Sequence, residues 1–264
     1  MPVCLLAAPP AGEAQFESYE RRGSGGFRIV VHVCGSGQSV PSRDWSQGAY
    51  MARYGDFYEN KVTGERGVVL RGDEDSGDQP ALVHLVVQPH GAVAGEHIHP
   101  RFQESFQVIS GRLGTRVDGV ERMLTAGEKA VAVPGTWHDF WNAGEEEAHV
   151  LVEFWPLYPR FEQMIGTLYG LANAGKTNAK GMPNPLQLAL TGREFQDVAQ
   201  FAKPPRAVQR VMFGLLGPIG RMRGYRGIYP EYCHPHGRTT PDPAVLALAG
   251  LAPPDQDDVN GARP

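Results

Sequence analysis

The chain has 264 residues and a formal net charge of −4, from 25 Lys and Arg against 29 Asp and Glu. This length suffices for one large domain with extensions, and a nearly balanced charge argues against nucleic acid as a partner. The sequence has no apolar run of the roughly 18 residues that a membrane-spanning helix needs. Three widely spaced cysteines disfavour a disulfide framework and indicate a reducing compartment, so we expect a cytoplasmic protein.

The first 50 residues are rich in Ala, Pro, Gly and Ser, and within them only 27–33 has the pattern of a strand. We expect residues 1–50 to form a poorly ordered extension. A short apolar patch over residues 1–10 has no Lys or Arg before it, so a secretory signal is not expected. A more regular pattern begins near Met51, and one hypothesis is that the functional chain starts there.

Residues 51–156 have the pattern of an all-β domain. Short runs rich in Val, Leu, Ile and aromatic residues recur there, each bounded by Gly, Asp, Asn or Pro. The predicted strands are 67–70, 82–88, 103–109, 113–117, 129–133, 138–142 and 149–155. Asp118-Gly119 is typical of a tight hairpin turn. Many short strands with regular turns favour a sandwich or barrel, in which closure removes the exposed strand edges.

Residues 157–230 change to a helical period. Apolar residues first recur at helical spacing in Phe161, Met164, Ile165, Leu168 and Tyr169. A second helix is predicted over 184–202, with Pro185 at a tolerated early position. A third stripe consists of Val208, Val211, Met212, Leu215, Leu216 and Ile219. We expect these helices to pack against the barrel or against a partner subunit.

Two features at the end of the chain leave alternatives open. Arginines flank the third stripe, so a helix over 206–222 could lie on an anionic membrane surface, but Gly214, Gly217 and Pro218 interrupt it and favour packing on the barrel. Residues 231–264 are rich in Pro, Asp, Ala and Gly and predict a disordered tail, although 244–251 could form one or two helical turns.

Two spaced motifs inside the β region contain a complete set of metal ligands. The first consists of Gly91, His97, His99, Glu104 and Gly111, and the second of Gly127, Pro134-Gly135, His138 and Asn142. Three imidazoles and one carboxylate supply four ligands to one divalent ion. On a six-coordinate ion they leave two positions for substrate, water or dioxygen.

The alternation of side chains along a strand tests whether these ligands can converge. His97 and His99 share one face of a strand, whereas Glu104 lies an odd number of residues from both. Pro100 ends the hydrogen-bonded ladder, so a bend over 100–102 can reset the alternation. Glu104 then points inward together with Phe106 and Val108.

The two motifs resemble the paired motifs of the cupin superfamily. Every position of the first motif fits, and in the second Val133 stands where the family has a proline, which affects the turn but no ligand. The resemblance spans about residues 65–156, and the helical extension resembles that of bacterial single-domain cupins. It implies an all-β core, a double-stranded β-helix (jelly-roll barrel), followed by C-terminal α-helices. It also implies that His97, His99, Glu104 and His138 bind a metal.

Three further residues are candidates for a substrate pocket. Phe106 and Phe140 share the inward face with the ligands, so they line either the pocket or the barrel core. His84 lies on a central strand and could face the barrel interior. Cys233-His234-Pro235-His236 offers too few ligands for a second metal site, so none is expected there.

The ligand set supports three classes of function. The first is a metal-dependent enzyme, an oxygenase for a small oxygen-bearing molecule, in which Glu104 could also accept a proton if it detaches from the metal. Similar cupins include isomerases and decarboxylases. The second is a non-catalytic module that binds a small molecule, and the third a storage protein. An intact ligand set favours the first. The expected cofactor is one divalent ion (Fe, Mn, Ni, Cu or Zn), and analogy with other cupins implies a homodimer without nucleic acid or membrane partners.

Overall fold

The computed structural model describes residues 16–22, 28–34, 51–72, 78–92 and 95–252. The chain divides into two compact units, Met1–Gln47 and Gly48–Pro264. In the first unit, β1 (Phe16–Arg22) and β2 (Arg28–Cys34) form an antiparallel hairpin. The sequence predicted the second of these strands but not the first, whose residues FESYERR are mostly charged and lack an apolar run. The other residues of the expected 1–50 extension lie outside the described ranges.

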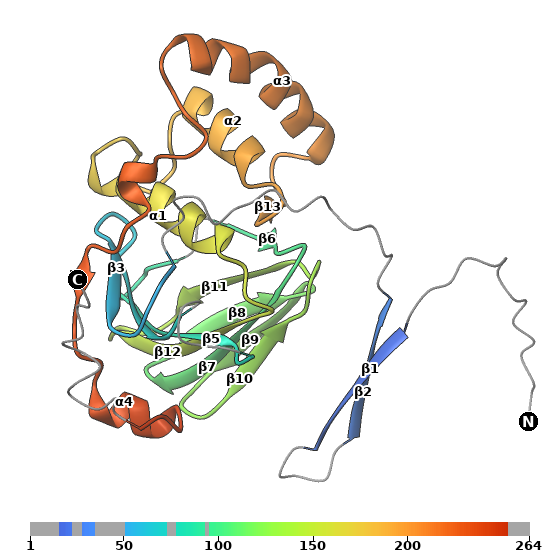
Figure 1. The fold of residues 1–264 in the computed structure, drawn as a ribbon, viewed down its shortest axis with the longest axis vertical. Coiled ribbons are helices and arrows are strands. Elements are labelled where there is room, and N and C mark those ends of the chain that lie inside the picture. Colours follow the sequence, from blue (N-terminus) through green and yellow to red (C-terminus); the bar gives the residue numbers. More distant parts are fainter. Residues whose placement is uncertain (1–15, 23–27, 35–50, 73–77, 93–94, 253–264) are drawn as a thin grey trace, which may run out of the picture. The chain divides into compact units, whose positions relative to one another are not determined.

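The second unit is built on two antiparallel sheets (Figure 1). The larger sheet has the order β10-β7-β12-β5-β4-β3-β14. Its strands are β3 (Asp56–Asn60), β4 (Glu65–Arg71), β5 (Ala81–Val87), β7 (Gln103–Ser110), β10 (Lys129–Ala132), β12 (Ala148–Trp155) and β14 (Gly237–Arg238). The smaller sheet has the order β13-β6-β11-β8-β9. Its strands are β6 (His97–Ile98), β8 (Leu113–Val117), β9 (Val120–Leu124), β11 (His138–Asn142) and β13 (Gln200–Phe201).

All seven strands predicted from apolar runs are present, and the all-β barrel is confirmed. Asp118 and Gly119 both have positive φ, 51° and 75°, in the hairpin that joins β8 to β9, as the tight turn requires. The core between the sheets contains fully buried Phe102, Phe106 and Val150. Burying one such side chain contributes about 1.5–3 kcal/mol, so these apolar faces hold the sheets together.

In the described part of the chain, four α-helices and one 3-10 helix come after β12, with β13 and β14 between them. They are α1 (Arg160–Asn173), α2 (Pro185–Glu194), α3 (Arg206–Met222), η1 (Pro230–Tyr232) and α4 (Pro243–Leu248). The predicted stripe of α1 faces the barrel, where Phe161, Ile165 and Leu168 pack against its core. Among the described helices, none is long and apolar enough to cross a membrane.

The second helix is shorter than predicted. The Asn184 side chain caps its start by accepting hydrogen bonds from Leu186 N and Gln187 N, and Pro185 occupies the first turn as expected. The helix ends at Glu194, because Phe195 and Val198 turn back into the barrel core. The chain then pairs with β6 through Gln200 and Phe201. Tertiary contacts therefore override the helical pattern over 195–202.

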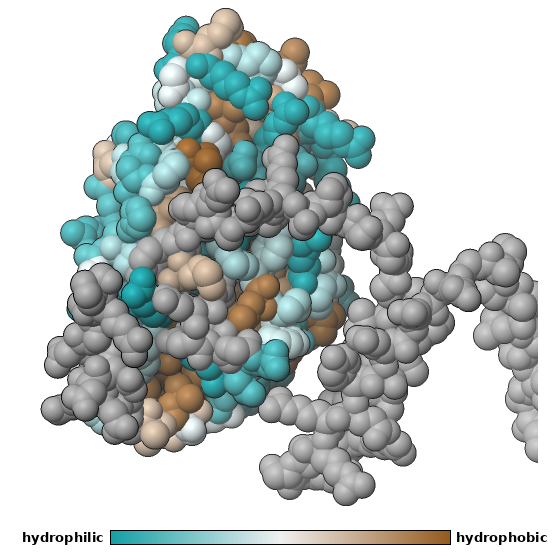
Figure 2. Space-filling view, viewed as in Figure 1, coloured by the Kyte–Doolittle hydropathy of each residue, from teal (hydrophilic) through white to brown (hydrophobic). Residues whose placement is uncertain are grey.

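The third helix packs on α2 rather than on the barrel. Its buried residues are Gly217 and Gly220, and a Cβ on Gly220 would lie 3.0 Å from Leu190 Cδ1. The predicted apolar stripe, including Val211 and Leu215, is exposed (Figure 2, upper edge over α3). The expectation that this stripe packs on the barrel is therefore wrong, because the small residues Gly217 and Gly220 on the opposite face allow a closer approach to α2. Packing of the stripe on a partner subunit stays a prediction.

The expectation of a disordered tail from residue 231 is wrong for residues 231–252. β14 pairs with β3 at the edge of the larger sheet. On α4, Val245 and Leu246 are buried against Leu70, Leu82 and Leu151. The polar and small residues of this segment gave no sign that Val245 and Leu246 are buried. Their packing against the barrel stabilises the segment. Residues 253–264 lie outside the described ranges.

Candidate metal centre

The two sheets bring the four predicted ligands to one point. His97 lies on β6, Glu104 on β7 and His138 on β11, while His99 follows β6 directly. Their four ligand atoms all lie within 4.8 Å of one another. Glu104 Oε2 is 3.2 Å from His99 Nε2 and 3.0 Å from His138 Nε2. All four side chains are buried.

The bend predicted around Pro100 brings Glu104 to the same side as the histidines. β6 ends at Ile98 and β7 begins at Gln103, so the strand alternation restarts between His99 and Glu104. A backbone hydrogen bond of 2.9 Å from Gly135 N to His99 O ties the second motif to this connection. Gly135 has a φ of 81°, a conformation that favours glycine, which explains its place in the motif.

The outer ring nitrogens fix the orientation of all three imidazoles. Each Nδ1 lies within hydrogen-bond distance of a backbone carbonyl: His97 with Gly95 O at 3.0 Å, His99 with Val198 O at 2.8 Å, and His138 with Thr136 O at 2.9 Å. A carbonyl only accepts hydrogen bonds, so each Nδ1 carries the proton and each Nε2 is free to act as a ligand. Metal-binding histidines in proteins are held in the same way.

The inner side of the centre requires a cation. The Nε2 atoms of His99 and His138 each lie about 3 Å from Glu104 Oε2, and unprotonated all three atoms would be acceptors. Either a proton or a metal ion must lie between them. Three neutral imidazoles and one carboxylate suit a borderline divalent ion, so the residues present fit a bound metal.

The charges of the centre lead to the same conclusion. Burial, followed by the neighbouring histidines, lowers the pKa of His97 to about 3, which keeps this ring neutral. Burial alone would raise the pKa of Glu104, but hydrogen bonds from His138 and His99 outweigh it and hold that pKa far below its usual range. Burial also acts to lower the pKa of His138, but the hydrogen bond to Glu104 outweighs it, so this pKa is raised overall. Without metal, a proton shared with Glu104 therefore supplies the cation.

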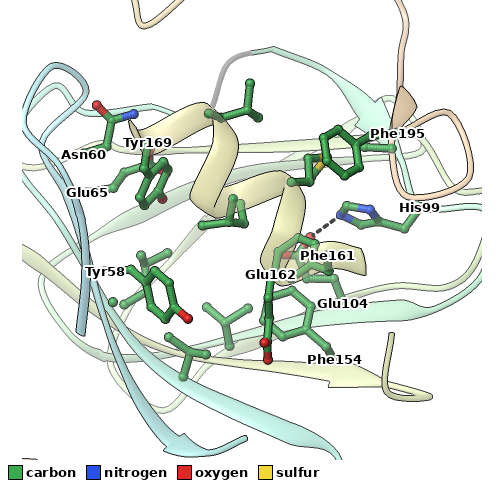
Figure 3. A pocket seen from close by; sticks show the side chains of 18 of the residues that line it. Tyr58, Asn60, Glu65, His99, Glu104, Phe154, Phe161, Glu162, Tyr169 and Phe195 are labelled. Carbon is green, nitrogen blue, oxygen red and sulfur yellow. Dashed lines mark hydrogen bonds and ion pairs between the residues drawn. The ribbon is translucent and has the colours of Figure 1, made fainter. Parts of the chain in front are cut away.

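A cavity of about 210 Å³ opens onto this centre (Figure 3). His97, His99 and Glu104 contribute to its lining. Aromatic side chains surround them, namely Phe102, Phe140, Phe154, Tyr158, Phe161, Phe195 and Phe201. The helix α1 supplies part of this wall, so the cavity is partly a product of the helical extension. A largely apolar molecule with an oxygen at one end fits such a site.

The predicted pocket residues have three different locations. Phe140 lines the cavity as expected. Phe106 is fully buried in the core and is not part of the lining; its ring centroid lies 5.0 Å from that of Phe140. The assignment of His84 to the pocket is wrong. Its neighbours Val83 and Leu85 line the cavity, so His84 points to the opposite face, where its ring stacks on His149 at 5.2 Å.

The sequence did not predict the part of the lining that β3, β4, the turn between them and α1 supply. It includes Tyr58, Asn60, Thr63, Glu65 and Tyr169. The strand β3 was missed because DFYEN has polar residues at both ends. Strand alternation carried a signal for Glu65, because it shares parity with Gly67 and Val69, which also line the cavity.

Two other polar groups have structural roles. Asn142 Nδ2 donates to Val87 O and to Glu146 O, so this residue of the second motif ties strand ends together. In the Cys-His-Pro-His segment, Cys233 Sγ contacts Tyr229 O, and His236 Nδ1 accepts a hydrogen bond from Glu59 N. The two side chains thus bind separate backbone groups.

Comparisons with known proteins agree with the fold of this region. Residues 83–154 match a family model described as "Cupin domain". "Polyketide synthase CurC" of Streptomyces cyaneus is 31% identical over 84 residues, which cover 32% of this chain and 54% of CurC. "Probable oxidoreductase virH" of Hypocrea virens is 29% identical over 150 residues, covering 52% of this chain and 66% of virH. The chain thus spans about half to just under two thirds of these curated relatives.

A solved structure is also similar over part of the chain. An uncharacterized conserved protein with a double-stranded β-helix domain from Klebsiella pneumoniae is 26% identical, with a TM-score of 0.29. The match covers 33% of this chain and 72% of that protein.

Proposed function

Because this barrel belongs to the cupin superfamily, we propose that it binds one divalent metal ion and acts as an oxygenase-type enzyme on a small oxygen-bearing molecule. The observation that carries the proposal is the convergence of four ligand atoms within 4.8 Å beside a largely apolar cavity. Fe, Mn, Ni, Cu and Zn are the candidate ions. The similarity to a relative named as a probable oxidoreductase supports the choice of reaction class.

The residues around the centre have separable roles in this proposal. The chemistry that a bound divalent ion supplies is Lewis acidity towards a substrate oxygen and, with a redox-active metal, electrons for dioxygen. Glu104 is the carboxylate of the ligand set and would accept the proton of a substrate hydroxyl only after it detaches from the metal. Phe154 and Phe161 pack on the apolar part of the substrate and exclude water.

Elemental analysis tests the metal part of this proposal. Protein purified without chelators should contain about one divalent ion per chain. His99→Ala and His138→Ala should each lose that ion, because each removes one ligand. His84→Ala is the matched control, since it removes a barrel histidine that lies outside the cavity. Wild-type metal content in both ligand variants would reject the site.

Oxygen uptake tests the reaction class. The metal-loaded protein should consume dioxygen with at least one member of a panel of phenols and keto acids, and His99→Ala should not. Product formed without oxygen uptake would indicate the alternative, a cupin isomerase or decarboxylase, which uses the same ligands. Binding of a panel member without turnover would favour a non-catalytic binding protein.

We also propose that the protein acts as a homodimer in the cytoplasm. The homodimer is proposed by analogy with other cupins. The cytoplasmic location is proposed from the three widely spaced cysteines, which disfavour disulfide bonds. Sedimentation velocity would test the dimer, and a single species at 28.8 kDa would contradict it.

A further inference from the structure

The cavity has a second polar region that the metal centre does not use. Glu65 on β4 is 6% exposed and lines the cavity, and Tyr169 of α1 reaches it from the helix side. Figure 3 shows Asn60, Glu65 and Tyr169 gathered at one end of the pocket, with His99 and Glu104 towards the other. Two polar ends therefore face one enclosed space.

Hydroxyl groups, and no cation, accompany Glu65. Thr63 Oγ1 donates to Glu65 Oε2 at 2.7 Å, and Tyr169 lines the same end of the cavity, where its hydroxyl lowers the pKa of the carboxyl. No Lys or Arg of the described residues forms an ion pair with Glu65. Burial raises the pKa of this carboxyl to about 7, and the two hydroxyls only partly oppose that rise. A neutral carboxyl group offers both an O–H donor and a carbonyl acceptor.

The wall between the two ends is apolar. It consists of aliphatic side chains from the sheet and from α1, namely Val69, Val83, Leu85, Val152, Ile165 and Leu168. Burying a carboxyl group without a counter-ion costs folding free energy. A purely structural link between β4 and α1 would not need a carboxyl group. A ligand oxygen offers the missing partner when the cavity is filled.

We propose that Glu65 and Tyr169 form a second subsite, which binds a hydroxyl oxygen at the far end of the substrate. The substrate is then an elongated hydroxylated aromatic compound, apolar in the middle and oxygenated at both ends. One end lies at the four ligands and the other at the Glu65 carboxyl. This inference rests on the proposed function, because the near end is the one assigned to the metal.

Matched catechols test the subsite by calorimetry on metal-loaded, full-length protein. A series of 4-(ω-hydroxyalkyl)catechols is compared with 4-alkylcatechols of the same chain length, which share the metal-binding end and lack the distal hydroxyl. At one chain length the wild type should bind the 4-(ω-hydroxyalkyl)catechol about tenfold more tightly than the 4-alkylcatechol of that length. Equal affinity at every length would overturn the subsite while leaving the metal-end assignment in place. Failure of both series to bind would overturn both.

Variants separate recognition from structure. Glu65→Met should reduce the preference to less than twofold while leaving the affinity for 4-alkylcatechols unchanged. Glu65→Gln should retain the preference, because an amide still donates and accepts. A preference that survives Glu65→Met would overturn the proposal. If Glu65→Met does not fold, Tyr169→Phe decides, since loss of its hydroxyl should weaken binding of the hydroxyl compound alone.

Discussion

Two carboxylates in one cavity, Glu104 and Glu65, are buried to nearly the same degree, with 5% and 6% of their surfaces exposed. Their pKa values nevertheless move in opposite directions. Burial acts on both, but imidazoles hydrogen-bond to Glu104 and outweigh it, whereas Glu65 has only hydroxyl partners. The difference shows that the partner, rather than burial alone, decides whether a buried carboxyl is charged.

The same difference gives the cavity two chemically distinct ends. A charged carboxylate among imidazoles is suited to hold a cation, while a carboxyl with a pKa near neutrality is suited to hydrogen-bond a neutral oxygen. The charge of Glu104 contributes to the raised pKa of Glu65, so the two ends also influence one another. Four predictions test this contrast.

The largest effect is expected from neutralising the carboxylate at the metal end. Glu104→Gln should weaken metal binding by more than the roughly 100-fold that loss of an outer hydrogen bond costs, because it removes a charged ligand. Glu65→Gln is the matched control at the other end and should change metal affinity less than twofold. Competition titration with a chromogenic chelator measures both. Equal losses in the two variants would show that the ends are not distinct.

The pH dependence of stability tests the state of Glu65. Its pKa is about 7 in the folded protein against 4.5 in the unfolded chain, so its stabilising contribution is full below pH 4.5 and is lost as pH rises to about 7. Between pH 5 and pH 8 the wild type should therefore lose about 2 to 3 kcal/mol more unfolding free energy than Glu65→Gln. Urea unfolding at both pH values measures this, and parallel losses would contradict it.

A smaller effect should come from the loop that orients His99. Asp197 accepts hydrogen bonds from Tyr158 Oη at 2.6 Å and Arg160 Nε at 2.8 Å, next to the Val198 carbonyl that bonds His99. Asp197→Asn should loosen this loop and weaken metal binding about tenfold. Glu194→Gln, which alters a more exposed partner of Arg160, is the control. Unchanged affinity in Asp197→Asn would show that this anchor does not hold the ligand.

The smallest effect is expected for Tyr169→Phe. The Tyr169 hydroxyl lowers the pKa of Glu65, so its removal should raise that pKa further and cost about 1 kcal/mol of stability. Carbon-13 NMR of labelled glutamate carboxyls follows the titration. The control is Tyr232→Phe, which removes a hydroxyl that accepts a hydrogen bond from Lys176. It should leave the titration of Glu65 unchanged. A lower Glu65 pKa in Tyr169→Phe would contradict the assigned contact.

The cluster of His97, His99, Glu104 and His138 could be predicted from sequence because the signals for its first three residues are local, while the resemblance to the cupin superfamily supplied His138. The spacing of the two histidines on one strand face and the interruption at Pro100 together indicated that Glu104 turns inward. The cavity could not be predicted in this way. Its far end combines Glu65 at the start of a strand with Tyr169 from a helix about a hundred residues later, and no local pattern links them.

The errors have the same physical origin. His84 was assigned to the interior because its strand is central, but strand alternation places Val83 and Leu85 inside instead. The predicted helix over 184–202 extends beyond Glu194 because its composition remains helical, whereas burial of Phe195 in the barrel ends it. In both cases the local sequence allowed two conformations, and packing against distant residues determined which one forms.

The hydrogen bond between His99 and Val198 O determines how this chain can be divided. The acceptor comes from 99 residues further along the chain, and Gln200–Phe201 pairs with the ligand-bearing strand β6. A fragment ending at residue 156 would keep all four coordinating side chains, yet His99 would lack its acceptor and β6 would have a bare edge. Residues 97–138 and the segment around Val198 and Gln200–Phe201 therefore form one structural unit, and a barrel cut from this chain would need both to keep the four side chains in place.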